Sequence, residues 1–195
     1  MRDSGGARRG VRRSAAQDCG RGLNGCYLRR RGQETLLLSA IIRPAARIVL
    51  LDPAGAILLQ RFTSNEKSWW VCPGGGLNAG EDVLDGARRE ALEELGIEVE
   101  LGPEIWTRRH VFPWRDRVLD QRERFFLVRV PERFEPRPRI GDESLWAEGI
   151  REQRWWEVAE IEGDQTVEFA PRQLAQLLRA LESEGPPALP LDVGV

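Results

Sequence analysis

Three glutamates, Glu90, Glu93 and Glu94, have the spacing i, i+3 and i+4 in a segment with helical periodicity. At about 100° per residue, this spacing places their carboxylates along one side of one helix, next to an apolar stripe. The pattern predicts a helix over residues 82–95 that ends at Gly96. Converging anionic oxygens on a rigid element are what a hard divalent cation prefers. A solvated acidic face is the alternative, and three glutamates alone would favour it.

The loop before this helix shifts the balance toward a metal site. Gly74, Gly75 and Gly76 follow Pro73, which indicates a backbone that turns sharply and approaches another group closely. Arg89 lies beside Glu93 around the helix, where a guanidinium can grip one carboxylate in a bidentate manner and offset the like-charge repulsion.

The segment from Gly75 to Ile97 resembles the Nudix box, G-x5-E-x7-R-E-U-x-E-E-x-G-U, in which U is apolar. Every fixed position is filled, and Ala91 is only a small member of the apolar class. The fixed positions hold Gly75, Glu81, Arg89, Glu90, Ala91, Glu93, Glu94, Gly96 and Ile97. The resemblance covers roughly residues 41–183. Many members of this family carry an acidic residue where this chain has Asn78. The position lies outside the fixed pattern, so the difference affects only the local adjustment of the site.

This resemblance implies an α/β fold, an α/β/α sandwich around a mixed β-sheet. It also implies hydrolysis of a phosphoanhydride bond in a nucleoside diphosphate linked to another moiety, with Mg²⁺ as cofactor and Mn²⁺ as substitute. Glu90 and Glu94 are then direct metal ligands, and Glu93 is a ligand or supports one. Arg89 orients Glu93 or Glu90, Glu81 is a weaker auxiliary, and the Gly75 backbone lies near metal and substrate.

Other candidate site residues are less sharply defined by the sequence. Glu123, just before an expected strand at residues 125–130, is the candidate general base, with a surface glutamate between two arginines as the alternative. Trp70, or its neighbour Trp69, is a candidate for stacking on a base, although core packing suits most of the tryptophans better. His110 fits a structural or rim position better than a catalytic one.

The remaining elements follow from apolar runs and turn residues. Residues 45–51 and 56–59 flank a turn and predict a β-hairpin, residues 154–158 predict a strand, and residues 171–183 predict a second helix closed by Gly185. Three parts are expected: a basic, disordered extension (residues 1–40), the catalytic domain (41–184) and a C-terminal tail (185–195).

The charge distribution separates the extension from the domain. Residues 1–40 carry nine arginines against three acids, a balance of +6, whereas the rest of the 195-residue chain carries 20 basic and 28 acidic residues, a balance of −8. An acidic domain is a poor nucleic-acid binder, so a small nucleotide is the expected substrate. Three cysteines and one histidine exclude a disulfide framework and a His-rich metal site. No apolar stretch is long enough for a membrane span. A cytoplasmic monomer or homodimer is expected.

Two other functions remain open. One is a non-catalytic module that senses a nucleotide, although such modules usually lose box glutamates. The other is an RNA 5′-pyrophosphohydrolase assisted by the arginine-rich extension. Pro113 lies sixteen residues after Ile97, an offset that resembles ADP-ribose hydrolases. Among small substrates the sequence therefore leans weakly to ADP-ribose-like or modified nucleotides, and oxidised nucleoside triphosphates and dinucleoside polyphosphates stay open.

Overall fold

The computed structural model describes residues 20–22, 25–27, 40–64, 67–114 and 117–194, and the chain divides into two compact units, residues 1–40 and 41–195. In the first unit, β1 (Gly20–Gly22) and β2 (Gly25–Tyr27) form a short antiparallel pair. The rest of the expected disordered extension lies outside the described residues.

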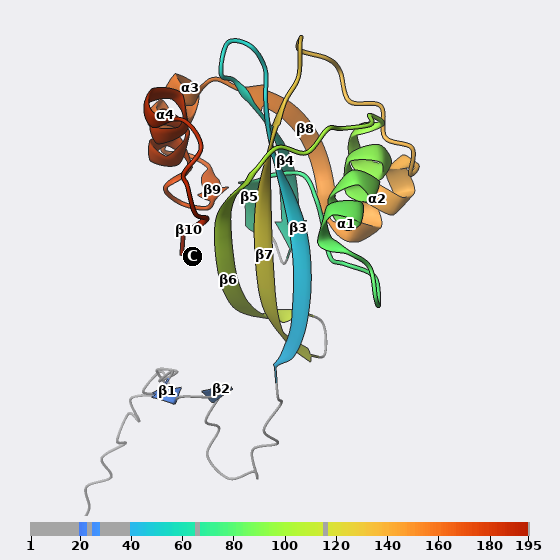
Figure 1. Cartoon of the computed structure of the whole chain (residues 1–195). Helices are drawn as coiled ribbons and strands as arrows, with labels where there is room; N and C mark the ends of the chain where they lie inside the picture. Colours follow the sequence, from blue (N-terminus) through green and yellow to red (C-terminus); the bar gives the residue numbers. More distant parts are fainter. Residues whose placement is uncertain (1–19, 23–24, 28–39, 65–66, 115–116, 195) are drawn as a thin grey trace, which may run out of the picture. The chain divides into compact units, whose positions relative to one another are not determined.

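The second unit is built on one mixed, eight-stranded sheet (Figure 1). Its strands are β3 (Ile41–Leu51), β4 (Ile57–Ser64), β5 (Lys67–Val71), β6 (Glu104–Trp114), β7 (Arg117–Arg129), β8 (Ile150–Trp156), β9 (Glu168–Ala170) and β10 (Leu191–Asp192). The order is β10-β6-β7-β3-β4-β5-β9, and β8 pairs with β4. The expected strand at residues 125–130 is the end of the longer β7, and the one at 154–158 is the end of β8.

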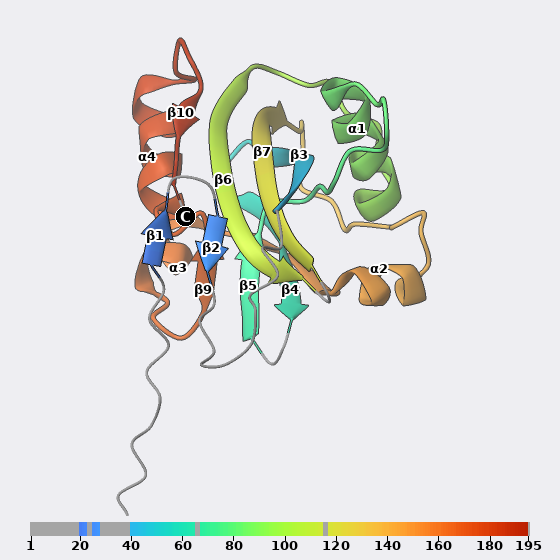
Figure 2. The same ribbon diagram turned by 90° about the horizontal axis from the view of Figure 1, so that it is seen from below.

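Helices cover both faces of this sheet (Figures 1 and 2). The helices are α1 (Val83–Glu90), its π-helical continuation η1 (Ala91–Leu95), α2 (Asp142–Glu148), α3 (Val158–Gly163) and α4 (Leu174–Glu184). α1 and α2 lie on one side and α3 and α4 on the other, so the expected sandwich around a mixed sheet is confirmed. The predicted helix at residues 82–95 is also confirmed, since Gly96 ends it with a left-handed φ of 74°.

Alternating residues of β3 divide the core between the two faces. Val49 and Leu51 belong to the cluster with α3 and α4, whereas Ile48 and Leu50 pack with η1. Both clusters are closed to solvent, so the sheet is a rigid support for the segment between β5 and α1.

The expected β-hairpin of β3 and β4 is present, but its ladder is short. β3 pairs in parallel with β7 from Ile41↔Leu119 to Leu51↔Arg129, but it meets β4 only at Leu51↔Ile57. The glycine-rich loop bonds to the edge of β3 along which β4 does not pair. Its residues 73–77 bond to β3 through Ala46 N to Gly75 O (3.0 Å), Ile48 N to Pro73 O (2.9 Å) and Leu77 N to Pro44 O (3.0 Å).

The C-terminal segment is more than the expected tail. β10 pairs in parallel with β6, Val193 N donates to Thr107 O at 2.9 Å, and Val193 is buried in the core. Residues 191–193 therefore pack with the sheet, within the segment 185–195 that was expected to form a C-terminal tail. None of the helices described is long and apolar enough to cross a membrane.

Candidate active site

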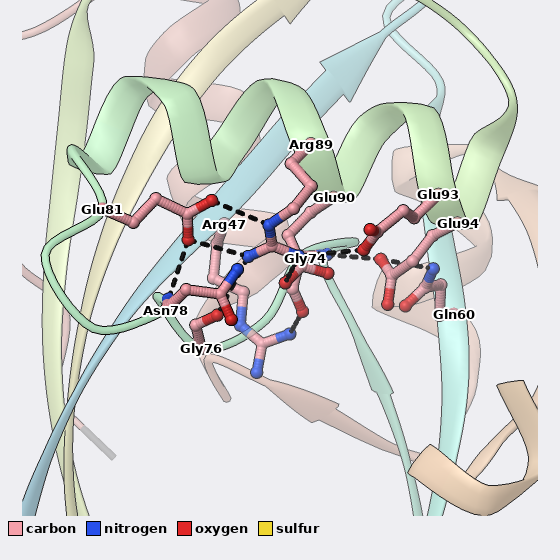
Figure 3. Close-up of polar contacts among 10 residues, drawn as sticks. All are labelled: Arg47, Gln60, Gly74, Gly76, Asn78, Glu81, Arg89, Glu90, Glu93 and Glu94. Atoms are coloured by element: carbon pink, nitrogen blue, oxygen red, sulfur yellow. Dashed lines mark hydrogen bonds and ion pairs between the residues drawn. The ribbon is translucent and has the colours of Figure 1, made fainter. Parts of the chain in front are cut away.

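The three glutamates lie where the acidic helix passes the glycine-rich loop (Figure 3). Glu90 closes α1 and is 5% exposed, and Glu94 in η1 is 1% exposed. The Glu93 side chain is 38% exposed and points along the helix surface. The sequence therefore placed the three carboxylates correctly on one side of the helix, with Glu94 buried deepest.

Glu94 is a buried carboxylate without a cationic partner among the described residues. It accepts hydrogen bonds from the Gly74 backbone N–H (2.7 Å) and from Nε2 of Gln60 on β4 (2.9 Å). Burial, and next the negative charge of Glu90, raise the pKa of Glu94 to about 7. A carboxyl with this pKa is ionised only at a considerable electrostatic cost, which a bound cation would remove.

Arg89 ties the acidic side of the helix together. Its guanidinium donates to both carboxylate oxygens of Glu81 (2.8 and 3.0 Å), and its Nη1 donates to Glu90 and Glu93 at 2.9 Å each. Arg89 contacts both glutamates that it was expected to orient, but its bidentate grip is on Glu81. The hydrogen bonds from Arg89 lower the pKa of Glu81 to about 2.

The glycines let the loop fit between the sheet and the helix. Gly74 has φ +121°, and a Cβ there would collide with the carbonyl of Ala46 on β3. At Gly75 a Cβ would lie 2.7 Å from Oε1 of Glu90. The Gly75 backbone therefore lies directly against a proposed metal ligand, as the resemblance implied.

The donor chemistry of this site fits a hard divalent cation. In the described part of the chain, no three acidic, histidine or cysteine side chains converge as a formed metal-binding group, since Arg89 holds Glu93 while Gln60 and Gly74 hold Glu94. The buried, unneutralised Glu94 beside Glu90 nevertheless provides the anionic oxygens that such a cation requires. A rotation of the half-exposed Glu93 would add a third carboxylate.

A family model settles the relationship of the chain. The NUDIX domain matches residues 41–178, which include all strands of the sheet except β10, the glycine-rich loop and the acidic helix. The chain belongs to the Nudix hydrolase family.

The chain spans only about three fifths of the length of the curated relatives that it matches. The chain is 28% identical to an RNA pyrophosphohydrolase of Roseobacter denitrificans over 45% of this chain and 61% of that protein. It is 35% identical to an RNA pyrophosphohydrolase of Wolbachia pipientis subsp. Culex pipiens, again over 45% of this chain and 59% of that protein. A MutT NUDIX hydrolase from Burkholderia pseudomallei has the same fold, with a TM-score of 0.52 and 22% identity over 70% of this chain and 98% of that one.

Glu123 was expected to be either the general base or a surface glutamate between two arginines. In this Nudix domain it is instead a buried member of an ion-pair network. It lies inside β7, 1% exposed, and accepts hydrogen bonds from Arg47 (2.8 Å), Arg108 (2.5 Å) and Gln121 (2.7 Å). Burial alone would raise the pKa of Glu123, but the charges of Arg47 and Arg108 outweigh it and lower the pKa to about 2. A carboxylate that already accepts three hydrogen bonds and has a lowered pKa is a poor proton acceptor, which disfavours Glu123 as the general base.

Trp70 is also not the stacking residue that it was proposed to be. It is 4% exposed and meets Trp156 edge-to-face at 5.0 Å inside the core shared with α4. Trp69 is only half-buried and, with Trp114, flanks Phe62 at ring distances of 6.3 and 6.0 Å.

Sequence reasoning missed Arg47, which links the loop to the sheet, and Gln60, which links the acidic helix to the sheet. Arg47 donates to the carbonyls of Cys72 and Gly74 while it pairs with Glu123, and Gln60 bonds Glu94. These partners are far apart in the sequence, so spacing gave no signal.

Glu148, the last residue of α2, is the acid that the sequence did not single out. Burial raises the pKa of Glu90, the charge of Arg89 lowers it, and the charge of Glu148 adds to the increase. The next residue, Gly149, accepts a hydrogen bond from the Thr63 backbone N–H at 2.8 Å, which fixes the end of α2 on β4. The Glu148 carboxylate is exposed and within electrostatic range of the acidic helix.

Proposed function

We propose that this Nudix domain hydrolyses a phosphoanhydride bond in a nucleoside diphosphate linked to another moiety, with Mg²⁺ as the metal. The observation that carries the proposal is the pair Glu90 and Glu94, two buried carboxylates side by side with a raised pKa. A bound cation would offset the electrostatic free-energy cost of keeping both carboxylates ionised. All box glutamates are present, which argues against a non-catalytic sensing module.

Glu90 and Glu94 would hold the metal directly, and Glu93 would join them or support them. A bound divalent cation supplies charge neutralisation of the phosphates and a lowered pKa of bound water. The protein provides rigidity: Arg89 restrains Glu90 and Glu93, and Gly74 and Gln60 restrain Glu94. These restraints reduce the reorganisation needed when the metal arrives.

Glu148 is the residue that we propose as general base. It is exposed, so its carboxylate has free lone pairs for a water molecule, and its charge acts on Glu90. Its place at the anchored end of α2 brings it to the site from a different element than the metal ligands. Glu123 is less suited to this role because Arg47 and Arg108 bind its oxygens.

A second candidate substrate is RNA with a 5′-pyrophosphate. The curated relatives named RNA pyrophosphohydrolase, at 28% and 35% identity, favour it. The acidic charge of residues 41–195 favours a small nucleotide, because phosphate backbones are bound by surplus Lys and Arg.

The test is a substrate panel with product identification at saturating Mg²⁺. The panel contains ADP-ribose, an oxidised nucleoside triphosphate, a dinucleoside polyphosphate and RNA with a 5′-triphosphate. We expect Mg²⁺-dependent release of a nucleoside monophosphate from at least one small compound, lost by several orders of magnitude in Glu90→Gln. Turnover on RNA alone would select the second candidate. Absence of turnover on every compound, or full activity of Glu90→Gln, would contradict the proposed chemistry.

A further inference from the structure

Arg43 on β3 differs from every other arginine that is not fully exposed in the described residues. Those others are Arg47, Arg61, Arg89 and Arg108, and each pairs with a glutamate. Arg43 is half-buried and forms no ion pair with a described residue. Its single protein hydrogen bond runs from Nη1 to the neutral amide oxygen of Gln121.

The network behind Arg43 fixes its orientation. Nε2 of Gln121 donates to Glu123, which leaves only the amide oxygen of Gln121 to face Arg43. The register pairs Arg43 with Gln121 across β3 and β7, and Arg108 with Glu123 across β7 and β6. These side chains therefore share one face of the sheet, and the guanidinium is held in place without being neutralised.

Three guanidinium groups come together on this face of the sheet. Glu123 is the one carboxylate in contact with Arg47 and Arg108, and Arg43 adds a third guanidinium to the same network. Burial and next the charge of Arg47 lower the pKa of Arg43, and the charges of Glu90, Glu123 and Glu148 offset only part of this decrease. A partly buried guanidinium that no carboxylate contacts is retained at such a cost where an anion is to be bound.

The guanidinium lies at the edge of the proposed metal site. A Cβ on Gly76 would be 2.6 Å from its Cζ, so Arg43 packs directly against the loop that carries Gly75. On its other side, Gly76 accepts a hydrogen bond from Arg89 at 3.1 Å through its carbonyl. The charge of Glu90 also acts on Arg43. A phosphate bound by a metal on Glu90 would therefore meet this guanidinium.

We propose that Arg43 binds non-bridging phosphate oxygens of the substrate. The inference rests on the proposed function and assigns a substrate-binding residue to it. A guanidinium has five N–H donors, and Arg43 uses one, to Gln121. The remaining planar fork matches two phosphate oxygens.

The test measures binding of methylenediphosphonate, a diphosphate mimic that is not hydrolysed, by calorimetry at fixed Mg²⁺. We expect Arg43→Gln to weaken Kd by about 10- to 100-fold, and Arg43→Lys to recover part of this loss because it keeps the charge without the fork. Arg88→Gln is the matched control, because Arg88 is exposed and pairs only with Asp85. It should bind as the wild type does.

Two further measurements separate this role from a structural one. The melting temperature of Arg43→Gln without ligand should equal or exceed that of the wild type, because an unpaired charge leaves the interior. Mn²⁺ binding should be unchanged, so failure of the metal site is recognised independently. The inference is overturned if Arg43→Gln binds methylenediphosphonate as tightly as wild type, or if its weaker binding comes with a lower melting temperature and no recovery in Arg43→Lys.

Discussion

Replacement of Glu94 by glutamine tests the electrostatic strain of the proposed site. The pKa of Glu94 rises from 4.5, its ordinary value, to about 7 in the fold. One pKa unit corresponds to about 1.4 kcal/mol, so ionised Glu94 costs the metal-free fold about 3 kcal/mol. A raised carboxyl pKa means that the folded state keeps its proton up to a higher pH than the unfolded state does. The loss of stability therefore begins above pH 4.5 and reaches its full size above pH 7.

Glu94→Gln removes this cost while the contacts survive. Both donors meet the same carboxylate oxygen, Oε2, so an amide oxygen in its place can accept from the Gly74 N–H and from Nε2 of Gln60 as Glu94 does. We therefore expect the variant to be more stable than the wild type by up to about 3 kcal/mol at pH 8 in chelator, and equal to it near pH 5. Urea unfolding at both pH values measures this difference.

Bound metal should reverse the order of stability of the wild type and Glu94→Gln. A cation that binds only the folded state adds roughly 2.7 kcal/mol at a hundredfold excess over its Kd. The wild type should gain this stability in millimolar Mg²⁺, and Glu94→Gln should gain much less. Glu98→Gln, at an exposed position just after the helix, is the control and should follow the wild type throughout. A variant that is less stable than wild type at pH 8 in chelator, with an equal response to Mg²⁺, would refute the reasoning.

Three further changes have defined outcomes. Glu123→Gln should destabilise the protein by about 3–5 kcal/mol in urea unfolding, since it leaves Arg47 and Arg108 without their carboxylate; a loss below about 1 kcal/mol would contradict the buried ion-pair network. Glu148→Gln should lower kcat by about 10²- to 10⁴-fold with KM and the Mg²⁺-induced rise in Tm unchanged, and unchanged kcat would remove it as the base. A chain that starts at Ala40 should keep its Tm and its activity on small nucleotides, and a large decrease in either would mean that the preceding residues support the domain.

Local patterns were enough to predict the helix and its carboxylates. Glu90, Glu93 and Glu94 lie within five positions, so helical geometry alone determines that they share a side. The setting of Glu123 was not predictable in this way, because Arg47 is 76 positions away and Arg108 is 15. Both become its neighbours only through the pairing of β7 with β3 and β6.

The tryptophan and the C-terminus were missed for related reasons. Trp70 and Trp69 are adjacent in a strand, so one must face the core and the other the opposite side, but the sequence does not say which. β10 has only two residues and pairs with a strand far back in the chain, so it has no periodicity of its own to recognise. Composition and spacing report local structure, and these features depend on tertiary contacts.

The loop of residues 73–77 acts as a substitute strand on β3, and this affects how the site exchanges its amide hydrogens. The Ala46 and Ile48 N–H groups are covered by loop carbonyls, so they exchange with solvent only when the loop detaches. The Gly74 N–H is covered by Glu94 in the same way. Isotope labelling at these three amides would therefore report the opening of the site directly, and a ligand that closes it should slow all three together.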